Sequence, residues 1–297
     1  MLGVVNLDKP VGPTSHDMVG LLRRLTGTRR IGHAGTLDPL ASGVLPILVG
    51  AATRFSEELT GGRKRYEAVI RLGERSATDD AQGPLERVRA PLPPVEAIKD
   101  ALQTFVGTFD QMPPAFSARK VGGRSAHRAA RVGEPLELAP RSVTVDAIEL
   151  LATEPGDEVV DVTIDLRCGP GTYVRSIARD LGERLGTGGH LRALRRTEAA
   201  GLRVAEAMTP AQLEELASHG RLADAILPAG ALLPIPHITL DAEAAWRFTH
   251  GAEQIIPGGD ADGKVAVFDA ASELLGIGLL QAGMLRPDKV LPVEVAP

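Results

Sequence analysis

Cysteine, aromatic residues and long apolar runs are scarce in this chain of 297 residues. The single cysteine, Cys168, excludes an internal disulfide and suits a reducing compartment. No apolar stretch approaches the roughly 20 residues that span a bilayer, and the N-terminus lacks the basic and apolar segments of a secretory signal. Seven scattered histidines without paired His or Cys spacing argue against a metal site. We therefore expect a cytoplasmic protein whose core, with only 3% aromatics, is mostly Leu, Val, Ile and Ala.

The net charge of −5 does not by itself indicate a nucleic-acid-binding protein, but the charges are unevenly distributed. Residues 1–66 carry a net charge of +4 and residues 167–205 one of +5, whereas residues 206–297 carry −8. Phosphate contacts need a local positive field, because salt screens each charge beyond about 8–10 Å. Either basic segment alone is typical of a solvated surface. Together, arginine-rich and next to glycine-rich loops, they indicate a groove for a polyanion.

The segment 32–46, GHAGTLDPLASGVLP, combines features of a catalytic loop. One carboxylate, Asp38, and one histidine, His33, lie in a glycine-rich stretch directly before an apolar run, 44–49, that predicts a buried strand. Glycines let a ligand approach the main chain closely, and a rigid strand behind the loop supports a catalytic side chain. Taken alone, an Asp-Pro pair is also typical of a simple turn cap.

Hydrophobic spacing predicts both strands and helices in the first 234 residues. Strands are expected at residues 2–7, 44–49, 66–72 and 160–166. Helices are expected after Thr14-Ser15 as far as Gly27, after Pro93-Pro94 as far as Gly107, after the glycine turn 169–171, and from the capping-box segment TPAQ at 209–212.

Two segments interrupt this pattern. Residues 111–135 are rich in Pro, Gly and basic side chains and contain a short predicted helix at 126–132, which is typical of a surface loop or of a mobile arm. Arm residues that could reach phosphates are Arg119, Lys120, Arg124, Arg128 and Arg131. The sequence PIP at 234–236 is the best linker candidate, and beyond it residues 264–268 and 274–280 predict short strands of a small β-barrel.

Several ordered motifs occur along the chain, namely NLDKPVGPTS at 6–15, GHAGTLDP at 32–39, KRY at 64–66, GTYVRS at 171–176 and LRRT at 194–197. In sequence and order they resemble the motifs of the TruB-type pseudouridine synthases, which isomerise the T-loop uridine at position 55 of transfer RNA. The resemblance implies an α+β fold, in which a mixed, largely antiparallel sheet is flanked by helices and carries an inserted RNA-gripping arm. It implies a catalytic domain over residues 1–234. The segments GIG at 276–278 and LRPDKVL at 285–291 resemble a PUA domain, an RNA-binding β-barrel, which implies a second domain over 235–297.

The resemblance also implies roles for three catalytic residues. Asp38 corresponds to the family's nucleophile, and Arg175 to the guanidinium partner that would keep it ionised under a base. Tyr66 corresponds to the residue that stacks on the flipped uridine, and its hydroxyl could act as a base at the ribose. A tyrosine at this position is otherwise an ordinary buried strand residue.

Four further residues are expected to bind the substrate. Tyr173 and Leu194 would complete the pocket wall, although Leu194 is nearly as well explained as a core residue. His33 would occupy the space left by extruded bases, and Lys9 would brace the loop beneath them. The reaction exchanges an N1–C1′ bond for a C5–C1′ bond without redox change, so we expect no cofactor. The expected partner is the T-arm of tRNA, bound by a monomer without membrane or guide RNA.

Two departures from the family pattern and several alternatives remain. Phe116 stands where the family commonly has tyrosine, and Gln82 stands where it often has aspartate, in a stretch beginning Asp79-Asp80 for which a turn is the default interpretation. A guide-dependent relative working inside a ribonucleoprotein and a non-catalytic RNA-binding module are the competing functions. The sequence also leaves open whether Asp38 attacks C1′, attacks C6 or assists a glycal route.

Overall fold

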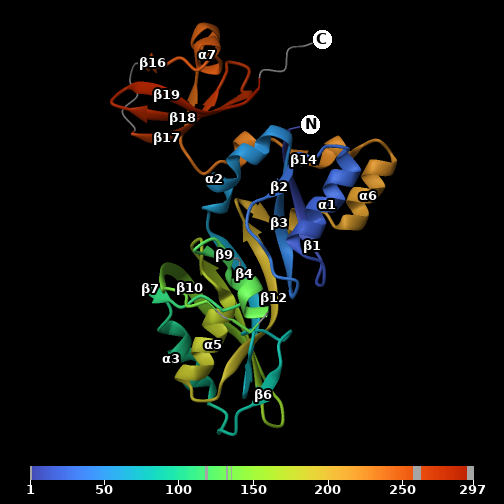
Figure 1. Cartoon of the computed structure of the whole chain (residues 1–297), viewed down its shortest axis with the longest axis vertical. Helices are drawn as coiled ribbons and strands as arrows, with labels where there is room; N and C mark the ends of the chain where they lie inside the picture. Colours follow the sequence, from blue (N-terminus) through green and yellow to red (C-terminus); the bar gives the residue numbers. More distant parts are fainter. Residues whose placement is uncertain (1, 118–119, 132, 135, 257–261, 293–297) are drawn as a thin grey trace.

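The computed structural model describes residues 2–117, 120–131, 133–134, 136–256 and 262–292, and its largest feature is a ten-stranded mixed sheet (Figure 1). All neighbouring strands are antiparallel except β3 and β12. The main path of the sheet runs in the order β14 (Ile226–Leu227), β1 (Gly3–Lys9), β3 (Ala41–Val49), β12 (Gly189–Ala199), β4 (Lys64–Leu72), β11 (Val160–Cys168), β10 (Arg141–Pro155) and β7 (Gly107–Gln111), with β2 (Ile31–His33) beside β3 and β13 (Leu202–Arg203) beside β12.

The described residues also form helices, most of which lie against this sheet or at its ends. They are α1 (Ser15–Thr26), α2 (Ser56–Thr60), α3 (Val95–Gln103), α4 (Ala126–Arg131), α5 (Val174–Arg184), α6 (Pro210–Ser218) and α7 (Ala242–Thr249), with short 3-10 turns at Gly50–Phe55, Val204–Glu206, Leu222–Ala225 and Ala229–Leu232. Two small hairpins pair β5 (Glu74–Ser76) with β6 (Leu85–Arg87) and β8 (Lys120–Val121) with β9 (Arg124–Ser125). Within the described residues, no helix is both long and apolar enough to span a membrane.

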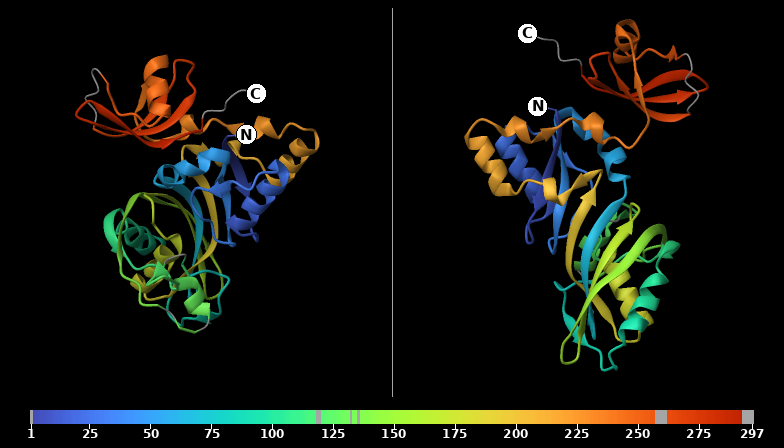
Figure 2. Two further views of the ribbon diagram at one scale, coloured as in Figure 1. Left: turned by 45° about the horizontal axis from the view of Figure 1, so that its top comes forward. Right: turned by 180° about the vertical axis from the view of Figure 1, so that it is seen from behind.

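Buried and more exposed side chains alternate along β4, so one face of the sheet is covered and the other is open. Tyr66, Ala68, Ile70 and Leu72 are buried and share a core with apolar side chains of α3 and α5, whereas the intervening residues face the other side. The two helices stand in front of the strands in Figure 1, and from behind the strands themselves face the viewer in the right panel of Figure 2. This covered face carries the site described below.

The predicted mixed, largely antiparallel sheet with flanking helices is confirmed, as are the expected strands and helices. Thr14 forms a capping box with Asp17 at α1, and Gly27 closes that helix in the left-handed conformation at φ 68°. One predicted boundary was wrong, because α3 ends at Gln103 and Gly107 begins β7. The chain after Gln103 tightens into turns of the i→i+3 type, with Val106 N donating to the Gln103 carbonyl at 3.1 Å.

The C-terminal part forms a five-stranded sheet with α7 beside it. Its order is β15 (His237–Thr239), β17 (Gly263–Phe268), β18 (Leu274–Gln281), β19 (Met284–Val290) and β16 (Gln254–Ile255). It joins the larger body through a shared apolar cluster and through Glu58 on α2, whose carboxylate accepts from Lys264 and Lys289 Nζ at 2.7 Å each. Burial raises the pKa of Glu58, but the two ammonium groups outweigh it and lower the pKa overall.

Candidate active site

Asp38 lies in the loop between β2 and β3, where hydrogen bonds fix the backbone around it. At the start of α1, the Ser15 hydroxyl accepts from Leu37 N at 2.8 Å and donates to the Leu37 carbonyl at 3.0 Å. The Asp38 carbonyl accepts from Ala41 N at 3.0 Å. Gly35 adopts a φ of 98°, which favours glycine over residues with a side chain. The loop therefore presents the Asp38 carboxylate, 39% exposed, from a rigid mount.

Arg175 is the ion-pair partner of Asp38. Its Nε lies 2.9 Å from Asp38 Oδ2, and its side chain, on the first turn of α5, is 7% exposed. Its Nη2 donates to the Phe116 carbonyl at 2.9 Å and its Nη1 to the Thr78 carbonyl at 3.2 Å. Because the bond at residue 116 is made to the main chain, the phenylalanine found there in place of the family's tyrosine leaves this contact intact.

The Asp79–Asp80 segment clamps α5 through two ion pairs. Asp80 Oδ2 lies 3.7 Å from Arg175 Nη1, and Asp79 Oδ2 lies 3.0 Å from Arg179 Nη1, one helical turn further on. Burial raises the pKa of Asp79, with Arg179 opposing. The expected turn is present, since Asp80 Oδ1 accepts from Gln82 N at 3.0 Å, but the sequence analysis missed both ion pairs. Two arginines spaced i, i+4 on one helix were the signal that paired carboxylates could face them.

Tyr66 and Arg196 form the floor of the site. They are Cα partners on β4 and β12, and both are buried. Arg196 Nε donates to the Val44 carbonyl at 2.7 Å and its Nη2 to the Gly35 carbonyl at 2.9 Å, so the guanidinium ties β12 to both ends of the Asp38 loop. Burial raises the pKa of the Tyr66 hydroxyl, and the nearby Arg196 charge opposes that shift. The LRRT motif contained Arg196, but we assigned it no role from the sequence.

These groups surround a cavity of about 250 Å³. Five of the predicted site residues line it, namely Asp38, Tyr66, Tyr173, Arg175 and Leu194. The remaining lining residues are Gly35, Thr36, Leu37, Thr60, Lys64, Gly171, Thr172, Val174 and Arg196. The cavity thus joins one carboxylate, its guanidinium partner and an aromatic ring from three distant parts of the chain.

Lys9 is fully buried beneath the site and does not line the cavity. Its Nζ donates to the carbonyls of Pro10 and Pro13 at 2.8 Å each. Burial lowers the pKa of Lys9 to about 8, although the nearby Asp38 charge opposes the shift. Lys9 therefore supports the turn between β1 and α1, which touches the Asp38 loop where Gly12 N donates to the Pro39 carbonyl at 2.8 Å.

His33 lies at the end of β2, half-buried and outside the cavity lining. Its Nδ1 is buried and has no hydrogen-bond partner among the described residues. Burial lowers the pKa of His33, and the Arg196 charge lowers it further, so the ring is predominantly neutral at pH 7. The structure therefore places His33 beside the Asp38 loop but not within the cavity lining.

Two further residues that sequence reasoning missed shape the cavity wall. Gln111 is buried at the end of β7, where its Oε1 accepts from Tyr173 N at 2.8 Å and its Nε2 donates to the Tyr173 carbonyl at 3.1 Å. Lys64 Nζ donates to the carbonyls of Thr60 and Gly62 at 2.8 and 2.7 Å. Burial, and then the Arg196 charge, lowers the pKa of Lys64 to about 8.

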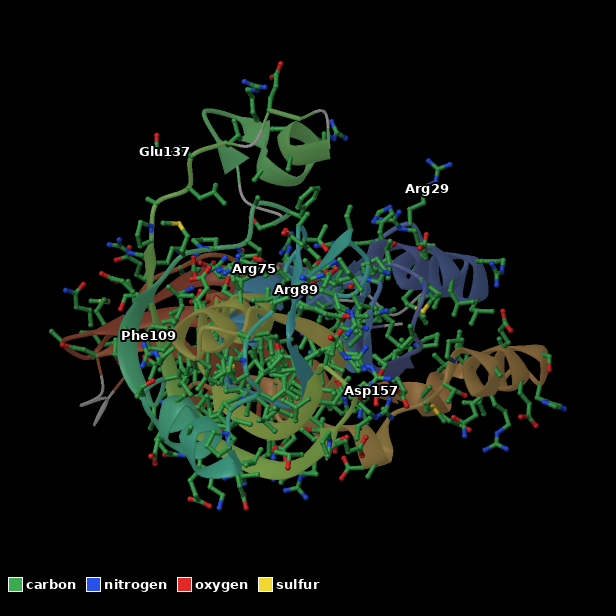
Figure 3. All side chains as sticks on the ribbon, turned by 90° about the horizontal axis from the view of Figure 1, so that it is seen from below. Arg29, Arg75, Arg89, Phe109, Glu137 and Asp157 are labelled. Carbon is green, nitrogen blue, oxygen red and sulfur yellow. The ribbon has the colours of Figure 1, made fainter. Side chains whose placement is uncertain are left out.

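The predicted arm projects beyond the site. Figure 3 shows it standing off from the body of the molecule, with Glu137 on its return segment. Its helix is α4, and Arg124 pairs with Glu134 at 2.8 Å while Arg128 is exposed. Arg119 and Val132, and the side chains of Lys120 and Arg131, lie outside the described residues. In the described ranges, no group of three His, Cys, Asp or Glu side chains is arranged to hold a metal ion.

Family models match almost the whole chain. Residues 23–174 match the TruB family pseudouridylate synthase N-terminal domain, residues 175–234 the tRNA pseudouridylate synthase B C-terminal domain, and residues 236–291 the pseudouridine synthase II TruB C-terminal domain. Among curated relatives, the tRNA pseudouridine synthase B of Ralstonia pickettii is 41% identical and covers 97% of this chain and 94% of its own. That of Acaryochloris marina is 42% identical over 99% of this chain and 100% of its own, and that of Mycobacterium tuberculosis 40% over 96% and 98%.

Solved structures support the same assignment. An H/ACA ribonucleoprotein bound to a substrate RNA containing 2′-deoxyuridine includes a chain with a TM-score of 0.76 and 26% identity, which covers 99% of this chain and 87% of its own length. A Cbf5–Nop10–Gar1 complex gives a TM-score of 0.75 and 27% identity over 98% of this chain and 85% of its own. The family matches, the relatives and the shared fold together show that this chain is an enzyme of the TruB family of pseudouridylate synthases.

Proposed function

We propose that the chain converts uridine 55 in the T loop of tRNA to pseudouridine, acting as a monomer in the cytoplasm without cofactor or guide RNA. The observation that carries the proposal is the Asp38–Arg175 ion pair, which opens onto a small cavity beside a buried tyrosine. The curated relatives are named for tRNA, which supports that substrate class. A division into a catalytic domain over residues 1–234 and a PUA-like RNA-binding domain over 235–297 forms part of the same proposal.

In the proposed mechanism, Asp38 is the nucleophile. The reaction breaks the N1–C1′ bond, turns the uracil, forms the C5–C1′ bond, and releases the C5 proton while N1 gains one. A carboxylate can add to an electron-poor carbon and later leave, and Arg175 Nε, 2.9 Å away, holds the Asp38 carboxylate in place beneath the base. The same assignment accommodates attack at C1′, attack at C6 or a glycal route, because each uses the Asp38 carboxylate.

The target base has to leave the folded T loop, which costs a few kcal/mol. Stacking on Tyr66, worth roughly 1–3 kcal/mol per base, offsets that cost, with Tyr173 and Leu194 as the remaining wall. Because burial raises the pKa of Tyr66, its hydroxyl is protonated before substrate binds, and a role as base at the ribose begins from that state. His33, at the rim of the loop, would fill the space the extruded bases vacate, while Lys9 supports the loop from below.

The test is tritium release from a [5-³H]uridine tRNA transcript, with the wild type beside Asp38→Asn and without added guide RNA. We expect release by the wild type alone, with the product mapping to position 55, and unchanged tRNA binding by the variant. Turnover by Asp38→Asn would overturn the nucleophile assignment. Wild-type activity that requires a guide RNA would favour the guide-dependent alternative, for which the likeness to H/ACA ribonucleoprotein structures is the supporting observation. Tight binding without any release would favour a non-catalytic RNA binder.

A further inference from the structure

A second, larger cavity of about 940 Å³ lies on the open face of the main sheet. It is bounded by the starts and ends of β4, β11, β12 and β13 and by residues 231–234, directly before the C-terminal sheet. Arg65, in its lining, neighbours Tyr66 on β4 and therefore points to the opposite side of the sheet. Lys64 lines both cavities, so they lie on either side of the same strand end.

A row of charged side chains crosses four neighbouring strands at this cavity. Arg167 on β11 pairs in register with Arg65 on β4, Arg65 with Glu198 on β12, and Glu198 with Arg203 on β13. Residues directly opposite one another in antiparallel strands face the same side. The row therefore holds three arginines and one glutamate, and it sets Arg65 directly against Arg167. Like charges in such positions destabilise a sheet, so this face sacrifices some stability to hold positive charge.

Carboxylates neutralise only part of this charge. Arg65 Nε pairs with Asp165 at 2.7 Å and its Nη1 with Glu198 at 3.5 Å, and Arg63 at the cavity rim pairs with Asp146. Arg167 and Arg203 are exposed, and within the described part of the chain neither has a carboxylate oxygen within 4.0 Å. The two guanidinium groups stand three strand spacings apart on one face, roughly 14 Å at about 4.8 Å per strand, so each can meet a different backbone phosphate.

The remaining lining indicates which part of an RNA would lie there. It consists of glycine, alanine, leucine and proline beside the charged groups and includes no aromatic side chain. Stacking platforms for unpaired bases need aromatic rings, so the cavity fits sugar–phosphate backbone rather than bases. The sheet itself separates this face from the cavity that Tyr66 lines. Nucleotides adjoining the flipped base are therefore held on the other side.

We propose that Arg167 and Arg203 bind backbone phosphates of the tRNA outside its T arm, at the junction with the C-terminal sheet. This inference rests on the proposed tRNA substrate. The groove is independent of the base-flipping cavity and reads no sequence, because phosphate contacts position a nucleic acid without specifying bases. It places a binding surface on the basic segment 167–205, so the acidic C-terminal part need not supply the phosphate contacts.

The test compares two RNAs and two matched double variants. The groove variant is Arg167→Gln with Arg203→Gln. The control is Arg75→Gln with Arg89→Gln. Both arginines are exposed, and neither has a carboxylate oxygen within 4.0 Å among the described residues. Both are labelled in Figure 3, and the β5–β6 hairpin that carries Arg75 lies at the end of the molecule away from the C-terminal sheet in Figure 1. Filter binding at several salt concentrations would use a complete tRNA transcript and an isolated T-arm stem-loop. Thermal melting would verify that each variant is folded.

For the groove variant, we expect the Kd for complete tRNA to rise roughly tenfold at 0.1 M salt and the slope of log K against log salt to shrink by about 1.5 to 2. Its Kd for the stem-loop and its kcat stay at the wild-type value, and the control variant stays near the wild type throughout. An unchanged Kd for complete tRNA, an equal loss on the stem-loop, or an equal loss in the control would each overturn the proposal. Because binding is measured apart from turnover, a wild type that binds tRNA through this groove yet forms no pseudouridine would refute the proposed function alone.

Discussion

Replacing Asp80 by asparagine tests whether Arg175 needs two carboxylates to hold its position. Asp80 is 4% exposed and its Oδ2 lies 3.7 Å from Arg175 Nη1, while its Oδ1 accepts from Thr78 Oγ1 at 2.6 Å and from Gln82 N at 3.0 Å. An asparagine carbonyl can retain the two accepted bonds. Its amide group then faces the guanidinium, and two donors oppose each other where a charge pair stood.

The size of the effect follows from the geometry. At 3.7 Å and an effective dielectric constant near 20, the lost attraction is roughly 4 kcal/mol. Arg175 retains Asp38 and two carbonyls as partners, so we expect only about half of this to be lost as transition-state stabilisation. A loss of about 2 kcal/mol corresponds to a roughly 30-fold lower kcat, with little change in KM because binding surfaces outside the ion pair are untouched.

Single-turnover tritium release at saturating enzyme measures this step directly. The matched control is Asp79→Asn, which removes an equal charge one residue away, keeps a residue type that tolerates the φ of 61° found there, and leaves the Arg175–Asp80 pair in place. We expect the control to retain kcat within a few-fold of the wild type. Wild-type turnover by Asp80→Asn, or an equal loss in both variants, would refute the argument that Asp80 acts by positioning Arg175.

Two further predictions concern buried groups of the site. Tyr66→Phe keeps the ring but not the hydroxyl, so tRNA affinity should stay near the wild type while kcat falls by about 100-fold or more. Tyr66→Leu removes the ring as well and should also weaken tRNA binding by roughly 1–3 kcal/mol. Equal kcat for the wild type and Tyr66→Phe would rule out a proton-transfer role for the hydroxyl. The pKa of Lys9 in the folded protein is about 8, below its ordinary value of 10.5. Between these pH values the unfolded chain binds more protons than the folded one, so the free energy of unfolding of the wild type should rise by up to roughly 3 kcal/mol as the pH rises from 8 to 10.5. Denaturant unfolding of the wild type and Lys9→Met at pH 7 and pH 10.5 measures this, and parallel pH profiles would contradict it.

Much of the fold followed from local patterns in the sequence. The alternation in β4 and β11 and the capping boxes at Thr14 and Thr209 depend on neighbouring residues, so their elements could be predicted. The end of α3 at Gln103 could not be predicted, because three i→i+3 turn bonds replace the helical pattern before the glycine that was expected to stop the helix. Strand order could not be derived from periodicity either, since the parallel β3–β12 pair joins segments about 150 residues apart.

In the site, too, some residues could be found from the sequence and others could not. Resemblance directed attention to Asp38, Tyr66 and Arg175, and the structure places their side chains around one cavity. The role of Asp80 was left open and Gln111 was missed, because their contacts with Arg175 on α5 and with Tyr173 directly before it are revealed by no local spacing. His33 and Lys9 were expected to contact substrate, and the structure places both outside the cavity lining.

The parallel pairing of β3 with β12 has a consequence for the order in which the protein can fold during synthesis. Asp38 is synthesised early, but Arg175 and Arg196 leave the ribosome much later, and the loop bearing Asp38 is joined to β12 only when Arg196 reaches the Gly35 and Val44 carbonyls. A nascent chain that stops at residue 174, where the first family model ends, holds the carboxylate without either cation. It also lacks the strand that joins β3 to β4. The Asp38–Arg175 ion pair and the strand between β3 and β4 therefore form late, so a fragment that ends before Arg196 cannot assemble the Asp38 site.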